Sequence, residues 1–281
     1  MSKLSAATPS IRTNLPPRYE VRKLTVEDIP WAMAIMLHSN IFYSSIWPVT
    51  YPDDKTARLY KCFQKGEYLI RHQVESGHSF GVFDLEYRFK REQSKATGGK
   101  LYWDFKTTSL GADELLEQMD FPLLSIALSY DQINPLVPAK LAPFLEELPL
   151  FGTAYHLLEK LDPRDKSWKA RRPNEVLLRN GTSTRRDAED LRLMAKLARF
   201  VMRYAAETGF LAIQIETFDD RVFNVWLEPP APFKGSRISH FNTWEYTEEE
   251  TFRELTRDIY PFGDAHQTVN KVFVELKPKR K

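Results

Sequence analysis

Cysteine is nearly absent from this 281-residue chain, which contains Cys62 alone. One thiol cannot form an intramolecular disulfide, and it cannot supply the several thiolate ligands of a cysteine-based metal site. The chain also lacks an apolar run long enough to span a bilayer. We therefore expect a protein of a reducing compartment, the cytoplasm, without a membrane partner.

A surplus of charge of one sign is missing as well. The 40 Lys and Arg residues nearly balance the 38 Asp and Glu residues, which leaves a formal charge of +2. Without a net field, electrostatics does not draw a protein to nucleic acid, so we expect no such partner. Basic residues cluster locally between Lys166 and Arg186, where they form either a solvated face or a surface for a phosphorylated ligand.

Histidine is the third scarce residue type, with six in the chain. No two of them have the i, i+4 spacing that is typical of metal ligands on one helix. The sequence therefore predicts no metal site.

The abundant residues predict one globular domain. Hydrophobic residues make up 42% and aromatic residues 13% of the chain, which is enough for a packed interior. Residues 1–18 are rich in Ser, Thr, Ala and Pro and lack the apolar segment of a signal peptide, so we expect a flexible leader. Residues 19–281 are expected to form a single α/β domain whose oligomeric state the sequence does not determine.

The first half of this domain is predicted to begin with a strand and two helices. Tyr19 to Leu24 alternates apolar and charged residues, as a half-buried strand does, and helical spacing of apolar residues follows from Thr25 and again from Asp53. Ser79 to Arg88 and Lys100 to Phe105 are predicted to pair as a hairpin. Residues 110–170 are predicted to be a helical insertion whose aromatic side chains cover the sheet or wall a pocket.

The second half contains the clearest pattern in the chain. Glu175 to Arg179 is predicted to be a strand, Asp187 to Thr208 a long helix with one apolar stripe, and Phe210 to Glu216 another strand. A helix between two strands implies that the strands pair in parallel. We expect a further strand from His240 to Tyr246, a short helix from Glu248 and a last strand from Lys271 to Leu276.

This order of elements resembles that of the GNAT (GCN5-related N-acetyltransferase) fold, and the block from Glu175 to Glu216 carries most of the resemblance. The chain also resembles a set of GNAT-like proteins frequent in filamentous fungi, through the stretches Met119-Asp-Phe-Pro-Leu, Arg179-Asn-Gly-Thr and Gly209-Phe-Leu-Ala-Ile-Gln-Ile-Glu. The resemblance implies a mixed α/β sheet and transfer of an acetyl group from acetyl-CoA to a small molecule.

The loop before the long helix departs from the family. There the family reads Gln/Arg-x-x-Gly-x-Gly/Ala, because glycines let the backbone approach the CoA pyrophosphate and the helix start binds the anion. The matching positions here are Asp187, Asp190 and Arg192. We expect the two carboxylates to repel phosphate and to cap the helical N–H groups themselves. Acetyl-CoA is thus the cofactor that the resemblance implies, and this loop argues against it.

The resemblance also indicates which residues would contact CoA and the leaving group. The cofactor-binding candidates are Val176, Leu178, Arg179, Arg185, Arg186, Arg192 and Asn224. Family members often place a proton-donating Tyr on the short helix after the parallel strand, and that place falls near Trp226. Indole cannot donate a proton at neutral pH, so Tyr246 is an alternative donor.

Two residues are candidate bases. Glu216 ends its strand at the expected opening of the sheet, where partial burial would raise the pKa of the carboxyl group; an ordinary solvated residue is the alternative. His240 is the second candidate, with a structural histidine as the alternative. The substrate-pocket candidates are Tyr43, Trp47, Tyr130, Trp226 and Trp244.

Three functions remain open from the sequence. The first is an acyl-CoA N-acyltransferase acting on a small molecule. The second is a GNAT fold that serves CoA-independent chemistry in specialised metabolism, such as cyclisation, isomerisation or elimination. The third is a non-catalytic ligand-binding or scaffold protein, because a fold does not fix a function.

Overall fold

The computed structural model describes residues 13–252 and 255–276. The expectations for residues 1–12 of the leader and for the Lys-rich tail after residue 276 lie outside this range. The helices are η1 (Val26–Asp28), α1 (Ile29–Tyr43), α2 (Trp47–Thr50), α3 (Lys55–Lys65), α4 (Glu67–Glu75), α5 (Glu92–Thr97), α6 (Ala112–Glu117), α7 (Pro138–Glu147), α8 (Pro149–Lys160), η2 (Lys166–Trp168), η3 (Arg186–Leu191), α9 (Leu193–Glu207) and α10 (Asp220–Leu227). The strands are β1 (Tyr19–Lys23), β2 (Phe80–Asp84), β3 (Lys100–Leu101), β4 (Met119–Asp120), β5 (Leu123–Asp131), β6 (Val176–Thr184), β7 (Ala212–Thr217), β8 (Lys234–Asn242), β9 (Glu248–Phe252), β10 (Leu255–Ile259) and β11 (Thr268–Glu275).

One mixed sheet organises the molecule. Within the described residues it has seven strands in the order β1-β2-β5-β6-β7-β11-β8. Neighbours pair antiparallel except β6 and β7, which pair in parallel. The α9 helix lies between the two strands of this parallel pair in the chain, as the sequence predicted.

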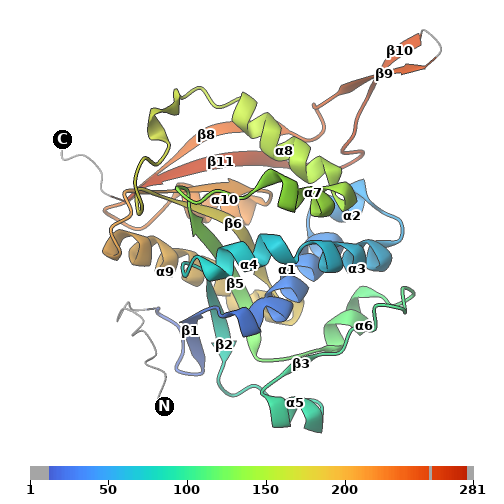
Figure 1. The fold of residues 1–281 in the computed structure, drawn as a ribbon, viewed down its shortest axis with the longest axis vertical. Coiled ribbons are helices and arrows are strands. Elements are labelled where there is room, and N and C mark those ends of the chain that lie inside the picture. Colours follow the sequence, from blue (N-terminus) through green and yellow to red (C-terminus); the bar gives the residue numbers. More distant parts are fainter. Residues whose placement is uncertain (1–12, 253–254, 277–281) are drawn as a thin grey trace.

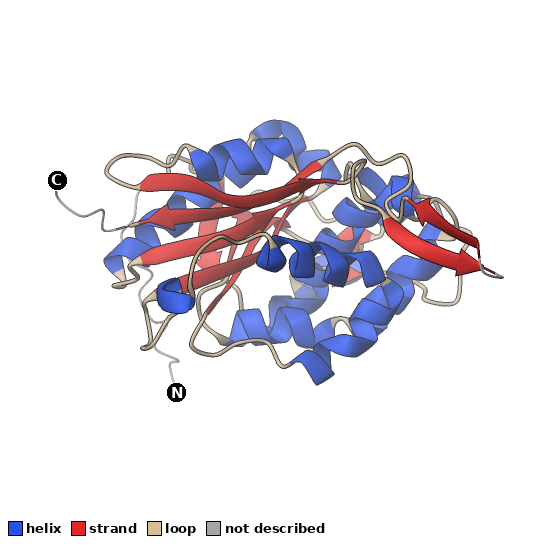
Figure 2. Ribbon diagram, turned by 90° about the horizontal axis from the view of Figure 1, so that it is seen from above, coloured by secondary structure: helices blue, strands red, loops and turns tan. Residues whose placement is uncertain are grey.

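Helices cover both faces of this sheet (Figure 2). The α1, α4 and α8 helices contact one face, and α9 and α10 contact the other. The apolar residues of β5 divide between the two cores: Ile126 and Leu128 pack with α1 and α3, whereas Leu124 and Ala127 pack with α9. Because both faces of β5 are covered, nearly all of its residues are buried.

The helix predicted from Asp187 is shorter than its apolar stripe suggested. Its first residues form η3, and α9 starts only at Leu193 after Arg192 adopts a left-handed conformation with φ of 54°. The stripe itself is confirmed, since Leu197, Val201 and Ala205 are buried against the sheet.

Two predictions for the first half were incomplete. The segment 110–170 does supply α6, α7 and α8, but it also contains the short strand β4 and the inner sheet strand β5, neither of which was predicted. The predicted hairpin is wrong, since β2 pairs with β1 and β5 while β3 pairs with β4. β5 was missed because both of its faces are buried. Its sequence therefore lacks the alternation of apolar and polar residues that indicates a strand.

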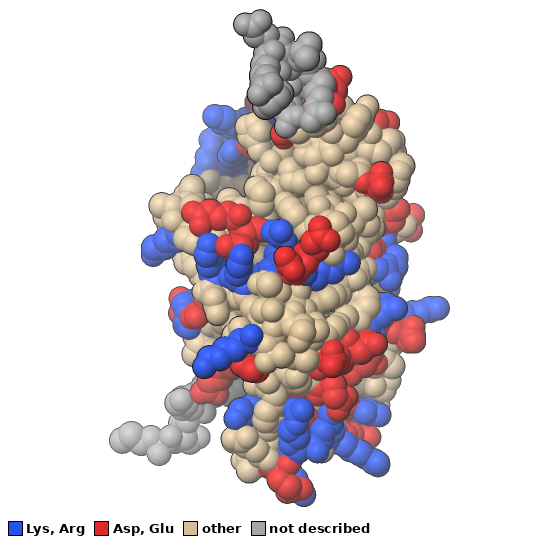
Figure 3. Space-filling view, turned by 90° about the vertical axis from the view of Figure 1, so that its right-hand side faces the viewer, with Lys and Arg blue, Asp and Glu red and all other residues tan. Residues whose placement is uncertain are grey.

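The region after β8 also differs from expectation. β8 begins six residues before His240, and the segment at Glu248 is the strand β9 and not a helix. β9 and β10 form a hairpin that extends away from the body of the molecule (Figure 1). On the face shown in Figure 3, acidic and basic side chains lie interspersed, in keeping with the small net charge.

Gly235 is a position where only glycine fits. A Cβ atom added there would lie 2.6 Å from the Trp226 carbonyl oxygen and closer still to that of Leu227. Both neighbours are backbone atoms at the end of α10, so they cannot move aside as a flexible side chain would. β8 can therefore approach α10 this closely only because residue 235 lacks a side chain.

We predict that Gly235→Ala lowers the free energy of unfolding by about 3 kcal/mol because of this overpacking. Gly152→Ala is the matched control, since its Cβ would meet only Leu145 side-chain atoms at 3.6 Å within α8. That control should leave stability unchanged or raise it by up to about 1 kcal/mol, because alanine favours helix. Urea denaturation of both variants tests this, and equal stabilities would contradict the close approach.

Candidate functional site

The site forms where β6 and β7 separate. Their parallel pairing extends only from Val176 to Arg179 on β6, although β6 continues to Thr184 and β7 to Thr217. At this point the β5 register shifts, so that Leu128 pairs with Gly181 but Ser129 pairs with Arg179. Asn180 is thus an inserted bulge residue, and a bulge bends its strand and re-aims side chains.

Arg179 holds this bulge from inside the protein. Its guanidinium is buried and donates to the Leu128 carbonyl oxygen at 2.5 Å, to Ser129 Oγ at 3.2 Å and to Thr182 Oγ1 at 2.6 Å. It therefore bonds to residues on both sides of the bulge. Burial without an anionic partner lowers the pKa of Arg179 to about 9, so the side chain still carries its charge at neutral pH.

A cavity of about 420 Å³ fills the gap between the separated strands. One side is lined by α1, α8 and the cavity face of β6, through residues such as Asn40, Phe151 and Tyr155. The other is lined by α9 and α10, through Met194, Ala195, Val222 and Val225. The cavity therefore reaches both layers of helices, and its volume suits a small organic molecule.

Aromatic rings form one wall of the cavity. The Trp47 ring centroid lies 6.1 Å from that of Phe151 and 5.8 Å from that of Phe218, and Phe151 and Phe218 stack at 6.0 Å. The Tyr155 ring continues this wall at 4.9 Å from Phe151. Such a wall favours a ligand with an apolar or aromatic body.

Glu216 places a carboxyl group in this apolar surrounding. It lines the cavity near the end of β7, and its Oε1 accepts a hydrogen bond of 2.9 Å from Gln214 Nε2. Burial raises the pKa of Glu216 to about 7, although the charge of Lys271 and the Gln214 hydrogen bond act in the opposite direction. The group can therefore exchange a proton near neutral pH, as a general base must.

Further polar atoms surround this carboxyl group. The Tyr155 hydroxyl accepts a hydrogen bond of 3.0 Å from Asn180 Nδ2, while burial and the nearby Glu216 raise the pKa of Tyr155 well above its usual value. Asn180 Oδ1 and Thr217 Oγ1 are buried and have no hydrogen-bond partner within the described chain. Both residues line the cavity, so polar side chains without an internal partner belong to its wall.

Backbone donors also face the gap. The Arg185 amide donates to the Leu124 carbonyl of β5, and Ser183 stands opposite Ile126 in the same register. Because backbone groups alternate between the two sides of a strand, the N–H groups of Thr182 and Thr184 point away from β5, toward the open side of β6. Such donors can stabilise negative charge on a bound carbonyl oxygen.

The loop before α9 differs from what its acids predicted. Asp187 does not cap a helix; its carboxylate accepts two hydrogen bonds, of 3.1 and 2.7 Å, from the guanidinium of Arg185. The Ala188 and Arg192 amides bond to carbonyls within η3, so they are not free to bind phosphate. Arg192 lines the cavity in the left-handed conformation that glycine adopts without strain. Two amides of this loop and the carboxylate of Asp187 are therefore engaged by groups of the chain itself.

Most of the predicted cofactor-binding residues do not line the cavity. Arg185 is 1% exposed and also donates to the Phe121 carbonyl, and Arg186 pairs with Glu189 at 2.6 Å. Of the predicted cofactor-binding residues, Arg192 lines the cavity. The others lie outside its lining: Val176, Leu178, Arg179, Arg185, Arg186 and Asn224. For Arg179 the reason is its role at the bulge, and for Asn224 it is an exposed position on α10.

The prediction of His240 as a base near the opening is not supported by its position. Glu216, Lys271 and Ser239 lie side by side across β7, β11 and β8, whereas His240 is one residue further along β8. Successive side chains of a strand point to opposite faces. His240 therefore lies on the other face of the sheet from Glu216, where it is exposed.

The predicted pocket residues divide in the same way. Tyr43 and Trp47 line the cavity as expected. Trp226 is fully buried in the α9 and α10 core, Tyr130 packs edge-on against His72, and Trp244 stacks on His266, so these three lie outside the lining. The residues of α10 that line the cavity are Arg221, which pairs with Asp219, and Val222 and Val225, which cannot donate a proton.

Several site residues had not been predicted. Asn180, Thr217 and Phe218 line the cavity, and Lys271 stands behind Glu216; Tyr155 and Phe151, by contrast, belong to the aromatic residues of 110–170 that were expected to cover the sheet or wall a pocket. The Asn180-Gly181 dipeptide was a usable signal, since such pairs mark irregular backbone. The others depend on the packing of α8 against the sheet, which no local pattern reveals.

Gly77-His-Ser-Phe-Gly matches the Gly-x-Ser-x-Gly pattern of serine hydrolases, and the structure excludes that role. Ser79 precedes β2 instead of turning from a strand into a helix, and its hydroxyl is buried. It donates to the Gln73 carbonyl at 2.7 Å. The serine thus fastens the end of α4 to the sheet.

Two kinds of feature are absent from the described residues. No helix there combines the length and apolar character of a membrane crossing. No group of three His, Cys, Asp or Glu side chains there is arranged to hold a metal ion.

Comparisons with known proteins bear on the fold. No family model and no curated protein matches the sequence. Among solved structures, the C-terminal condensation domain of Ebony in complex with beta-alanyl-dopamine is 17% identical, with a TM-score of 0.52 over 90% of this chain and 97% of that one. Arylalkylamine N-acetyltransferase 2 from Aedes aegypti is 11% identical, with a TM-score of 0.54 over 92% of this chain and 99% of that one. The chain therefore has the GNAT fold that its sequence resembled.

Proposed function

We propose that this protein transfers an acyl group to a small amine, with Glu216 as the general base. The observation that carries the proposal is the position of Glu216: a carboxyl group with a pKa of about 7 in an apolar cavity between the separated β6 and β7 strands. The shared fold supports it, because the two similar structures are named for a condensation domain with an acylated amine and for an amine N-acetyltransferase.

Recognition of an amine follows from the polar atoms of the cavity. An amine carries N–H donors, which a carboxylate accepts, so it can donate to Glu216, which lines the cavity together with Asn180. The ring wall of Trp47, Phe151 and Phe218 would hold an apolar or aromatic part of the same molecule. We therefore assign the acceptor to the small amines with an apolar body.

The chemistry needs one proton transfer and one displacement. The amine nitrogen bonds to the acyl carbon, the bond from that carbon to its leaving group breaks, and the amine proton passes to Glu216. A base whose pKa lies near the working pH performs this step well. The N–H groups of Thr182 and Thr184 would stabilise the negative charge that develops on the acyl oxygen.

A second candidate is catalysis without CoA, which the loop before α9 favours. Asp187 is paired with Arg185, η3 uses its own amides, and Arg192 fills the place where the family has glycine. If CoA does not bind, the acyl donor is another activated acyl compound, or the cavity serves a different reaction at Glu216. A non-catalytic ligand-binding protein is the third candidate.

We predict that Glu216→Gln lowers amide formation by at least about 100-fold, because a carboxamide cannot take the amine proton. The reaction is followed by mass spectrometry of N-acetyltryptamine, with tryptamine as acceptor and acetyl-CoA or p-nitrophenyl acetate as donor. The wild-type kcat/KM should rise with pH and level off above about 7, since protonated Glu216 is inactive below that pH.

Glu207→Gln, a change of an exposed carboxylate at the end of α9, is the matched control and should keep full activity. An equal loss in both variants would point to a general effect of charge and not to a base. Full activity of Glu216→Gln would remove Glu216 from the mechanism.

Calorimetric titration with acetyl-CoA distinguishes a CoA-dependent reaction from one that uses another acyl donor. We predict that acetyl-CoA binds the wild type weakly and that Asp190→Gly with Arg192→Gly binds it about tenfold more tightly, because one carboxylate is lost and glycine suits the left-handed position. Micromolar binding by the wild type would show that the loop holds CoA in a different geometry. No heat from either protein would favour the CoA-independent reaction.

A further inference from the structure

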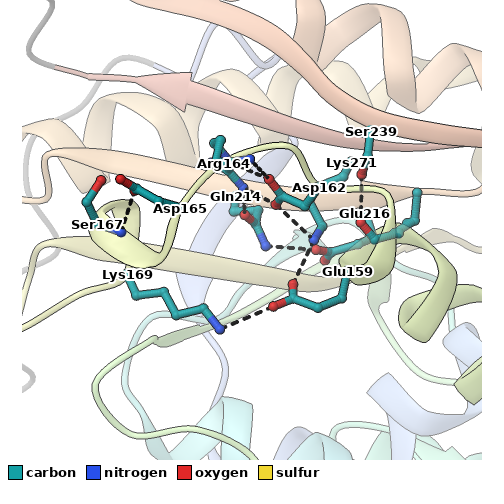
Figure 4. A network of polar contacts seen from close by, with 11 residues as sticks. Glu159, Asp162, Arg164, Asp165, Ser167, Lys169, Gln214, Glu216, Ser239 and Lys271 are labelled. Atoms are coloured by element: carbon teal, nitrogen blue, oxygen red, sulfur yellow. Dashed lines mark hydrogen bonds and ion pairs between the residues drawn. The ribbon is translucent and has the colours of Figure 1, made fainter.

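A chain of polar contacts extends from Glu216 away from the cavity (Figure 4). Gln214 and Glu216 are two residues apart on β7, so their side chains lie on the same face of the sheet. Gln214 Nε2 donates to Glu216 Oε1 at 2.9 Å, and Gln214 Oε1 accepts from Arg164 Nη2 at 2.9 Å. The amide of Gln214 thus joins a guanidinium to the carboxyl group.

The chemistry of the three groups permits one orientation of that amide. Arg164 can only donate hydrogen bonds, and an ionised carboxylate can only accept them. The amide oxygen must therefore face Arg164 and the amide nitrogen must face Glu216. Without Arg164, the amide could turn by 180° and present its oxygen to the carboxylate, which would be repulsive.

Arg164 is itself held on several sides. Its Nε and Nη2 donate to the two carboxylate oxygens of Asp162 at 2.9 and 2.7 Å, and its guanidinium lies 4.1 Å from the Trp168 ring centroid. Burial opposes ionisation of Asp162, but the hydrogen bonds and charge of Arg164 more than offset this and lower the pKa of Asp162 to about 2. The pair stays charged throughout the neutral range.

Lys271 anchors the far end of the network. Its Nζ is 3.2 Å from Asp162 and 2.9 Å from Glu159, and its side chain is 2% exposed. Lys271 is also the direct neighbour of Glu216 across β11 and β7. The other ionisable groups that influence Glu216 are Glu159 and Tyr155 from α8 and Tyr130 from β5.

We propose that Arg164 is a positioning residue, which through the amide of Gln214 engages one carboxylate oxygen of Glu216 and leaves the other for the substrate. The inference deepens the proposed function, because it rests on Glu216 being the base. Within the described chain, no other side chain donates a hydrogen bond to the Glu216 carboxylate. Oε2 is therefore the oxygen that would receive the amine proton.

The segment between α8 and β6 acquires a role through this contact. Arg164 lies on that segment, far in sequence from β7, yet it fixes a side chain on β7. The segment would otherwise be a connection with no part in the site.

The test measures Glu216 in the free protein, without any substrate. Carbon-13 NMR of selectively labelled glutamate carboxyl groups gives the pKa of Glu216, whose signal is assigned as the one missing from Glu216→Gln. We expect Gln214→Leu to raise that pKa by about one pH unit, since a hydrogen bond to the charged form is lost. Arg164→Met should raise it as well, and Arg164→Lys should restore only part of the effect, because lysine cannot bond to Asp162 and Gln214 in the same fork geometry.

Lys169→Met is the matched control. Lys169 pairs with Glu159 at 3.2 Å at the exposed end of the same network and does not contact Gln214, so its loss should leave the pKa of Glu216 unchanged. A pKa of Glu216 that stays at the wild-type value in folded Gln214→Leu would overturn the proposal. If Arg164→Met does not fold, Gln214→Leu alone decides.

The outcome is independent of acyl transfer. Shifted pKa values together with no amide formation in any protein would keep the positioning network and reject the proposed function. Where activity is present, the pH profile of kcat/KM should move upward in Gln214→Leu and Arg164→Met, whereas a merely structural role would lower stability and leave that profile in place.

Discussion

The rest of this structure depends on the hydrogen bonds that the buried guanidinium of Arg179 makes around the bulge in β6. Arg179 bonds to Leu128 and Ser129, between which the β5 register shifts, and to Thr182 beyond the bulge at Asn180. With the bulge in place, β6 turns away from β7 and the sheet opens at its centre. The cavity, the unpaired N–H groups of β6 and the access to Glu216 all follow from that opening. A protein can keep such a costly buried charge when nearby groups, here one backbone carbonyl and two hydroxyls, accept its hydrogen bonds.

Burial also explains why the two ends of the site differ in kind. Around Glu216 the charged groups are enclosed, so each is paired or has its pKa shifted, and their arrangement is fixed by contacts from three strands and a helix. Before α9 the ion pairs join near neighbours in sequence: Arg186 with Glu189, both partly exposed, and the buried Arg185 with Asp187. The base is therefore built by the tertiary fold, whereas the loop is built locally.

This difference accounts for what the sequence could predict. The strand, helix and strand around α9 have strong periodic patterns, and Glu216 at the end of the second strand followed from them. β5 was missed because a strand covered on both faces has no alternation, and it looks like a stretch of buried helix. Tyr155, Arg164 and Lys271 could not be assigned to the site because they meet β7 only after α8 and β11 have packed on it. His240 was predicted near the opening, but the pairing of β8 with β11 aligns Ser239 and not His240 with Glu216, and no local pattern reveals that pairing.

The enclosed network has a consequence for ionic strength. Dissolved ions screen charges that they can approach, and buried pairs feel little of this. The side chains of Lys271 and Asp162 are 2% and 5% exposed, whereas those of Arg186 and Glu189 are 50% and 24% exposed. Added salt would therefore loosen the loop before α9 and leave the surroundings of Glu216 almost untouched. The two halves of one cavity would respond to the same solution in different ways.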